Sequence, residues 1–203
     1  MKNLIQAVQL PASRIFNPAR LATSLLIAAA TGSVSTLSHA ANVQIDAPKS
    51  TVQVIFKQMN VPVQAQFKKF TATIDYNSAK PESSKAQVEI DASSLNLPAP
   101  EYNAEVLKKE WFNAAQFPKA SFVSTSMKSA GAGKLDVTGN LTIKGKTVVA
   151  SFPLSIKTEG KSVTFEGSLP IKRLTFNIGE GEWKDTSMIA DEVMIKFKVV
   201  ANQ

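Results

Sequence analysis

The stretch KLDVTGNLTIKGKTVVASFPLSIK, residues 134–157, decides the fold class of this 203-residue chain. Apolar residues occupy every second position on both sides of Lys144-Gly145, a dipeptide typical of a tight hairpin turn. The apolar positions are Leu135, Val137, Leu141 and Ile143 before the turn, and Ala150, Phe152, Leu154 and Ile156 after it. Alternation with period two is typical of antiparallel strands that bury one face. The stretch therefore predicts two long strands joined by a hairpin.

The same alternation recurs along most of the chain. It predicts further strands over residues 51–57, 64–76, 86–91, 163–171 and 193–199. Within 64–76 the phase of the apolar residues slips at Lys68-Lys69, which predicts a β-bulge. Turn signals at Lys80-Pro81, residues 130–133 and Glu159-Gly160 separate the strands. These patterns indicate about eight strands in a single domain.

Residues 101–112 are the exception to this pattern. They follow Pro98-Ala-Pro100, and Tyr102, Val106 and Leu107 have helical spacing, so one short helix is expected here. Strands with one apolar face must be covered, either by a second sheet in a sandwich or by closure into a barrel. The unusual length of 146–157 favours a barrel. Periodicity leaves open whether the interior is filled by side chains or holds a small ligand.

The first forty residues have the features of a secretory signal peptide. Lys2, Arg14 and Arg20 precede an apolar run over 21–30, and small residues lead to Ala40. We therefore expect residues 1–40 to be removed and residues 41–203 to form the mature domain in the periplasm. An uncleaved anchor is the alternative, although the apolar run is short for a membrane span.

Cleavage after Ala40 would remove His39, the only histidine, from a chain that has no cysteine. Zinc sites, Ser-His-Asp systems and thiol chemistry need these side chains, so we expect no metal, no cofactor and no enzyme activity. The densest acidic group, Glu180, Glu182 and Asp185, is better explained as a solvated loop. Cleavage would also lower the net charge from +7 to +4, which is compatible with anionic lipid headgroups and too weak to argue for nucleic acid, so we expect no nucleic-acid partner.

Four segments, in order, resemble the YceI family of exported lipid-binding proteins. They are Asp46-Ala-Pro-Lys-Ser50 before a strand, Trp111 to Phe122, the hairpin Val137 to Thr147, and Phe176-Asn-Ile-Gly179 before the last strand. The similarity extends over residues 42–200. The chain departs from the family at Lys49, where a histidine is common, so a family role for that side chain does not transfer.

The resemblance implies an all-β fold: a lipocalin-like, extended eight-stranded antiparallel barrel in the periplasm. Its members enclose long-chain isoprenoid lipids or isoprenoid quinones, and some relatives are encoded beside membrane b-type cytochromes. The resemblance thus implies a carrier or store for such a lipid. The alternative is an interaction module with a filled core, such as an accessory subunit of a cytochrome system. Whether the protein forms a homodimer stays open.

An isoprenoid tail would need walls of apolar residues. The candidates are Phe56, Ile74, Val88, Ile90, Phe122, Phe152, Leu154, Phe165 and Phe197. Plain core packing explains each of them equally well. Aromatic and apolar residues at the predicted helix end and before the last strand are candidates for the rim: Trp111, Phe112, Phe176, Ile178 and Trp183. Cations available for an anionic headgroup are Lys49, Lys68, Lys69, Lys108, Lys109, Lys172 and Arg173, and none is singled out.

Overall fold

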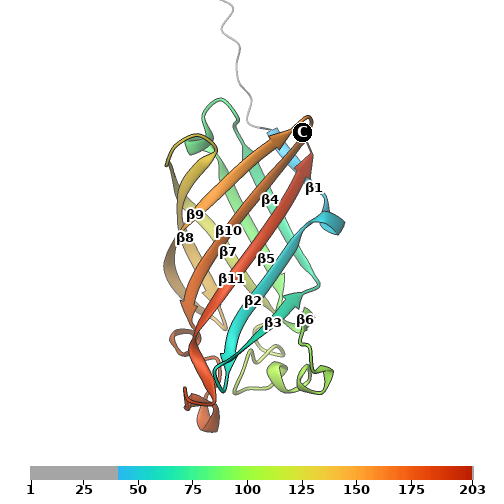
Figure 1. The fold of residues 1–203 in the computed structure, drawn as a ribbon, viewed down its shortest axis with the longest axis vertical. Coiled ribbons are helices and arrows are strands. Elements are labelled where there is room, and N and C mark those ends of the chain that lie inside the picture. Colours follow the sequence, from blue (N-terminus) through green and yellow to red (C-terminus); the bar gives the residue numbers. More distant parts are fainter. Residues whose placement is uncertain (1–40, 203) are drawn as a thin grey trace, which may run out of the picture. The chain divides into compact units, whose positions relative to one another are not determined.

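The structure is a computed structural model that describes residues 41–202. The predicted signal peptide, residues 1–40 with His39, lies outside the described residues. Eleven strands within the described part form one antiparallel sheet (Figure 1). The strands are β1 (Ala41–Ile45), β2 (Thr51–Gln58), β3 (Val61–Phe67), β4 (Phe70–Tyr76), β5 (Lys85–Asp91), β6 (Leu95–Asn96), β7 (Lys119–Ser129), β8 (Lys134–Ile143), β9 (Lys146–Glu159), β10 (Ser162–Lys172) and β11 (Ile189–Asn202).

Short 3₁₀ helices connect several of these strands. They are η1 (Ala47–Lys49), η2 (Pro81–Ser83), η3 (Ala92–Ser94), η4 (Pro100–Tyr102), η5 (Glu105–Leu107), η6 (Arg173–Phe176) and η7 (Gly181–Lys184). The segment 101–112, expected as one helix, instead contains η4 and η5. Its backbone makes isolated turns, such as Lys108 N–H to the Glu105 carbonyl, and the Asn103 side chain accepts a hydrogen bond from the Leu97 N–H. Val106 and Trp111 of this segment are buried against the core, so tertiary packing outweighs the local preference for a helix.

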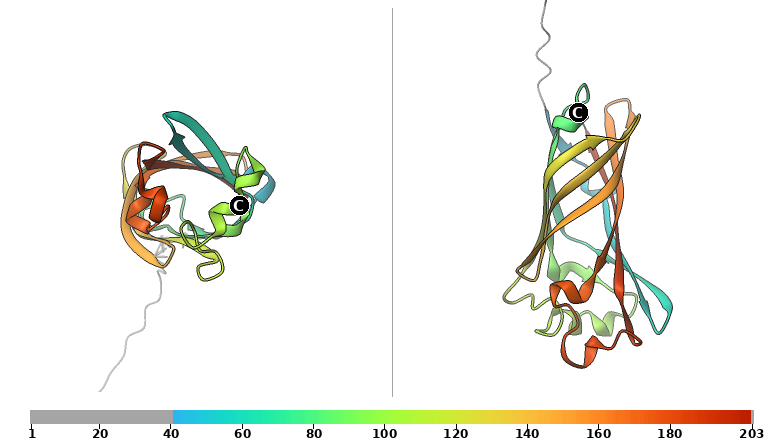
Figure 2. Two further views of the ribbon diagram at one scale, coloured as in Figure 1. Left: turned by 90° about the horizontal axis from the view of Figure 1, so that it is seen from below. Right: turned by 90° about the vertical axis from the view of Figure 1, so that its left-hand side faces the viewer.

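The sheet closes on itself. Its strand order is β1-β4-β5-β7-β8-β9-β10-β11, and β1 also pairs with β11, so these eight strands form a ring. The second view in Figure 2 shows the resulting barrel from the side. The closing contact is short, because β1 pairs with β11 only at Gln44–Asn202 and Ile45–Ala201. An antiparallel eight-stranded barrel is therefore confirmed, and a sandwich is not formed.

The three remaining strands continue strands of the ring. β2 follows β1 after η1 and pairs with β11, β3 precedes β4 and pairs with β2, and β6 follows β5 after η3. The break between β3 and β4 falls at Lys68-Lys69, where the sequence predicts a bulge. The ring thus consists of eight wall strands. Three of them are kinked, namely β1 continued by β2, β4 preceded by β3, and β5 continued by β6.

The hairpin that the sequence predicts at Lys144-Gly145 joins β8 and β9. Both residues have positive φ, 48° and 73°, as a two-residue hairpin turn requires, and Ile143 pairs with Lys146. Along β8 the odd-numbered residues are buried and the even-numbered ones face outward. Most of the buried apolar residues of the strands form one cluster inside the barrel, so the hydrophobic core and any interior cavity occupy the same space.

Candidate ligand cavity

An apolar cavity of about 120 Å³ lies inside the barrel. Its wall comes from β2, β4, β5 and β7–β11, and every lining side chain except Tyr76 and Ser84 is apolar. The lining residues are Val52, Ile74, Tyr76, Ser84, Ala86, Val88, Ile90, Phe122, Met127, Leu135, Val137, Leu141, Phe152, Leu154, Ile156, Phe165, Leu169, Ile195, Phe197 and Val199. No charged side chain lines the cavity. Such a wall favours an apolar ligand and offers no group for acid–base chemistry.

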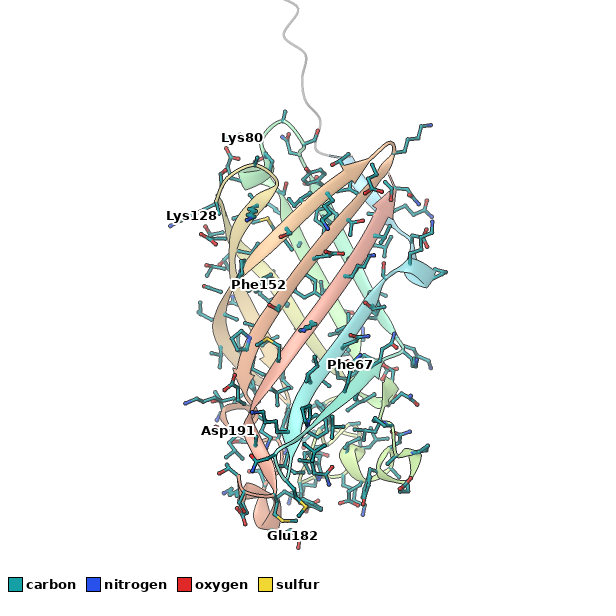
Figure 3. All side chains as sticks on the ribbon, in the orientation of Figure 1. Phe67, Lys80, Lys128, Phe152, Glu182 and Asp191 are labelled. Carbon is teal, nitrogen blue, oxygen red and sulfur yellow. The ribbon has the colours of Figure 1, made fainter. Side chains whose placement is uncertain are left out.

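Three phenylalanine rings form a connected row along the cavity wall. Phe152, labelled in Figure 3, contacts Phe122 with ring centroids 5.3 Å apart and Phe197 at 5.4 Å. The rings belong to β9, β7 and β11, so the row connects opposite parts of the barrel. Aromatic pairs at this spacing are stabilising, and the three rings together contribute a large apolar area to the cavity wall.

The two polar lining residues lie near the loop between β4 and β5. The Ser84 hydroxyl accepts a hydrogen bond of 3.0 Å from the Asn77 N–H, and Tyr76 packs edge-on against Phe165 at 5.3 Å. Burial raises the pKa of Tyr76, so its phenol stays protonated near neutral pH. This part of the wall therefore adds polarity without charge.

The structure brings eight of the predicted wall residues together in the cavity. They are Ile74, Val88, Ile90, Phe122, Phe152, Leu154, Phe165 and Phe197. The ninth, Phe56, packs partly buried against the core outside the lining. Lining a cavity is a matter of position, so the ligand-binding role of these residues stays a prediction.

The predicted rim residues lie outside the cavity lining. Trp111, Phe176 and Ile178 are buried, Trp111 packs on Trp183 with centroids 5.4 Å apart, and Phe112 contacts the Phe67 ring at 6.2 Å. They belong to the segments 105–113 and 173–184, which cover the lower end of the barrel in Figure 2. These aromatic side chains thus pack as a plug at that end.

Arg173 holds this plug together. Its side chain is 2% exposed, and its five N–H groups donate to five main-chain carbonyls. The acceptors are Ala190 (3.1 Å from Nε), Ile178 (2.9 Å) and Gly179 (3.2 Å) from Nη1, and Trp183 (2.8 Å) and Ile189 (2.7 Å) from Nη2. Burial lowers the pKa of Arg173 from its very high ordinary value. Arg173, one of the cations considered for a headgroup, therefore has no free donor.

Lys144 at the β8–β9 turn also binds the plug. Its ammonium donates to the carbonyls of Lys109 (2.7 Å) and Asn177 (2.6 Å) and to the carboxylate of Glu180 (3.0 Å). The Gly179 and Glu180 N–H groups donate to the Glu110 carbonyl. Three segments far apart in the sequence are thus joined by polar contacts at this end.

Sequence reasoning missed twelve lining residues. Many follow the same alternation that identified the others, as Leu135, Val137 and Leu141 do on β8. Val52 and Val199 could have been found in the same way on β2 and β11. Met127 could not, because the register of β7 shifts between Ser124 and Ser126 and changes the parity of its inward residues.

Two further features concern metals and membranes. The described residues include no group of three or more His, Cys, Asp or Glu side chains placed to hold a metal ion. In residues 41–202, no helix has the length and apolar character needed to cross a bilayer.

A closed antiparallel barrel around an apolar cavity defines the class of small β-barrels whose interior is either filled by side chains or holds one small ligand. The chain belongs to the YceI-like domain family, whose model matches residues 43–201. It is similar to Burkholderia cenocepacia BcnA, with 48% identity and a TM-score of 0.76 over 78% of this chain and 100% of that one. The predicted resemblance is therefore confirmed.

More distant solved structures share the fold. A Campylobacter jejuni YCEI protein has 23% identity and a TM-score of 0.63, over 68% of this chain and 84% of that one. A polyisoprenoid binding domain from Saccharophagus degradans, implicated in plant cell wall breakdown, has 17% identity and a TM-score of 0.63, over 79% and 98%. Among curated relatives, a UPF0312 protein of Pseudomonas savastanoi pv. phaseolicola is 36% identical over 99 residues, 49% of this chain. The chain spans 52% of the length of that relative.

Proposed function

We propose that this protein is a periplasmic carrier or store that encloses the tail of a long isoprenoid lipid or isoprenoid quinone. The observation that carries the proposal is an interior cavity with no charged side chain in its wall. The name of the Saccharophagus degradans domain, which shares the fold, supports isoprenoids as the ligand class. The predicted signal peptide supports export, and the uncharged wall supports binding without catalysis.

The present volume sets a condition on this function. A cavity of about 120 Å³ has room for a molecule about the size of benzene, whereas pockets for larger ligands measure roughly 300–1,000 Å³. A long tail therefore requires side chains inside the barrel to move apart. Burying about 700 Å² of tail would contribute on the order of 15 kcal/mol before ordering costs, enough to offset such a rearrangement.

The small cavity also favours a second candidate. If the interior keeps its present volume, the barrel is a filled scaffold, and the protein is an interaction module such as an accessory subunit of a membrane b-type cytochrome system. A homodimer is a further form that this module could take.

The test is to express the full chain, purify the protein from the periplasmic fraction and record its native mass. A discrete added mass, identified after extraction as an isoprenoid or a quinone, supports the carrier function. A mass of the polypeptide alone is followed by titration with a long-chain quinone and with geranylgeraniol. If neither binds, the carrier function is rejected and crosslinking to membrane partners tests the second candidate.

A further inference from the structure

The turn of the β2–β3 hairpin exposes apolar side chains beside a neighbouring loop. Met59 in the turn is 65% exposed, and Val61 at the start of β3 is 62% exposed. Met188, in the loop before β11, is 46% exposed, and its carbonyl accepts a hydrogen bond of 2.8 Å from the Met59 N–H. These three residues are among only seven large hydrophobic residues that are exposed in the part of the chain that the structure describes. Together they form one surface, the apolar tip.

Met59 occupies its place in the turn against the preference of the backbone. Met59 and Asn60 both have positive φ, 49° and 65°. A two-residue turn of this kind favours asparagine, aspartate or glycine, and a methionine in it is strained. Met59 gains no burial in return, because most of its surface is in water. A residue that strains the turn and does not pack in the core indicates a role outside the fold.

Val61 continues the apolar face of β3 past the core. Ala65 and Phe67 on this face are buried, Val63 is half-buried, and Val61 is exposed. Figure 2 shows the hairpin projecting from the barrel wall, at the end that the plug covers. The apolar face of the strand therefore extends beyond the barrel, where it is open to an outside partner.

The free edge of β3 is unsuited to a partner that adds a strand. Among the described residues, β3 pairs on this edge only with the two-residue strand β6. In a two-residue hairpin the pair that flanks the turn is hydrogen-bonded. Here that pair is Gln58–Val61, so the next pair, Lys57–Pro62, is not, and the Pro62 nitrogen faces the free edge. A proline on an edge discourages pairing with another chain, because it has no N–H to donate.

The segments that form the apolar tip carry no net charge. Lys57 lies on the hairpin, and residues 181–188 contain Lys184, Glu182 and Asp185. All four side chains belong to exposed residues, and the Asp185 carboxylate accepts two hydrogen bonds from Ser187. A strongly charged partner is therefore not favoured. Three apolar side chains are also few beside a stable protein interface, which takes roughly 20–30 residues on each side.

We propose that the apolar tip is a membrane-docking surface, which inserts Met59, Val61 and Met188 into the interfacial layer of a lipid bilayer. A bilayer accepts a small, projecting apolar surface, and the strength of binding follows the apolar area that leaves water. Methionine side chains are flexible and adapt to such a surroundings. This inference goes beyond the proposed function, because it concerns attachment of the protein to a bilayer and not the ligand of the barrel.

The experiment measures how much of the purified product of the full chain floats with phosphatidylcholine vesicles, at low and at high salt. The variant M59N/V61T removes two apolar side chains of the tip, and V123T/V149T is the matched control. Val123 and Val149 are exposed valines on β7 and β9, away from the hairpin. Thermal unfolding verifies that both variants are folded. M59N/V61T should unfold at no lower temperature than the unaltered protein, because asparagine suits the turn.

A second measurement locates the contact with the vesicle. The chain has no cysteine, so Gln58→Cys and Ser151→Cys each provide a single site for a fluorophore that reports transfer out of water. Gln58 adjoins the turn, and Ser151 is exposed on β9. With vesicles, the emission at position 58 should shift to shorter wavelength, and the emission at position 151 should stay unchanged.

We expect the unaltered protein to bind the vesicles about equally at both salt concentrations, M59N/V61T to bind about tenfold more weakly, and V123T/V149T to bind as the unaltered protein does. Absence of vesicle binding, binding that high salt abolishes, or equal losses in both variants overturns the docking surface. An equal emission shift at both labelled positions also overturns it. Self-association that M59N/V61T abolishes would assign the tip to a second copy of the chain instead. The carrier function is tested separately, by titration with geranylgeraniol.

Discussion

Phe197 on β11 lies directly across the sheet from Gly167 on β10, and its ring occupies the space that a side chain at Gly167 would need. The same ring contacts Phe152 and lines the cavity. Because Gly167 has no side chain, the Phe197 ring can lie against its backbone, and this determines where the ring stands in the cavity wall. An aromatic ring that covers a glycine on the neighbouring strand is a known way of filling a sheet.

Gly167→Ala should accordingly shrink the cavity. The three atoms nearest to the added methyl group all belong to the Phe197 ring, so the ring must move while the backbone stays in place. We expect about a tenfold loss in geranylgeraniol affinity and a loss of stability of about 1–3 kcal/mol. Calorimetric titration and urea unfolding measure these effects, with Ser168→Ala on the next residue as the control. Unchanged affinity would show that Phe197 does not limit the ligand space.

Gly139→Ala should lower the stability of the fold more than Gly167→Ala does. Its methyl group would collide with the Phe122 ring and also with the main-chain carbonyl of Val123 on the paired strand. A backbone carbonyl cannot rotate away, so β7 and β8 must separate locally. Urea unfolding of the two variants side by side checks the order, and an equal loss in both would contradict it.

Phe152→Asp should abolish retention of lipid. A carboxylate in the middle of the phenylalanine row would lie in an uncharged wall, where its desolvation costs several kcal/mol. Ser151→Asp, on the exposed face of the same strand, is the control. Because the buried acid can unfold the barrel, Val88→Thr serves as a milder second variant that keeps the volume. Retention by a folded Phe152→Asp protein would place the tail elsewhere.

Arg173→Met should destabilise the fold without changing the cavity wall. Five main-chain carbonyls would lose their donor, which we expect to cost about 3 kcal/mol or more. Gly179→Ala should act on the same cluster, since a Cβ there would collide with Arg173 Nη1. Denaturant unfolding measures both losses. Geranylgeraniol affinity should remain within about twofold in the folded protein, and a larger change would mean that the plug contacts the ligand.

The parts of the fold that can be predicted from the sequence are those formed by contacts between residues close together in the chain. Alternation and turn residues are local, so the β8–β9 hairpin and the break at Lys68-Lys69 are found where the patterns put them. β1 is not predicted, because its five residues become a strand only through pairing with β4 and β11. The helix expected over 101–112 is replaced by turns, because Val106 and Trp111 are buried by contacts with residues distant in the sequence.

The same distinction between local and distant contacts applies to the residues of the candidate site. Inward residues on regular strands could be predicted, because parity decides which way they face. The role of Arg173 could not, since its five acceptors come from carbonyls between residues 178 and 190 whose positions depend on the folded loops.

The ion pair between Lys144 and Glu180 should make the plug sensitive to acid. The hydrogen bond from Lys144, whose side chain is 6% exposed, holds the pKa of Glu180 below its ordinary value of 4.5. The folded protein therefore binds this proton less readily than the unfolded chain does. Consequently, the stabilisation is complete above the unfolded-state pKa and disappears as the pH falls through the folded-state pKa.

Glu180→Gln keeps the shape of the side chain and removes its titration. The urea midpoint of the unaltered protein should exceed that of the variant at about pH 7, and the two should converge by about pH 3. Asp91 and Asp185, whose pKa values are lowered by hydrogen bonds from Ser93 and Ser187, make both proteins less stable in acid. The difference between the two midpoints therefore isolates Glu180. A difference that stays constant across this range would show that Lys144 stabilises the plug through the Lys109 and Asn177 carbonyls alone.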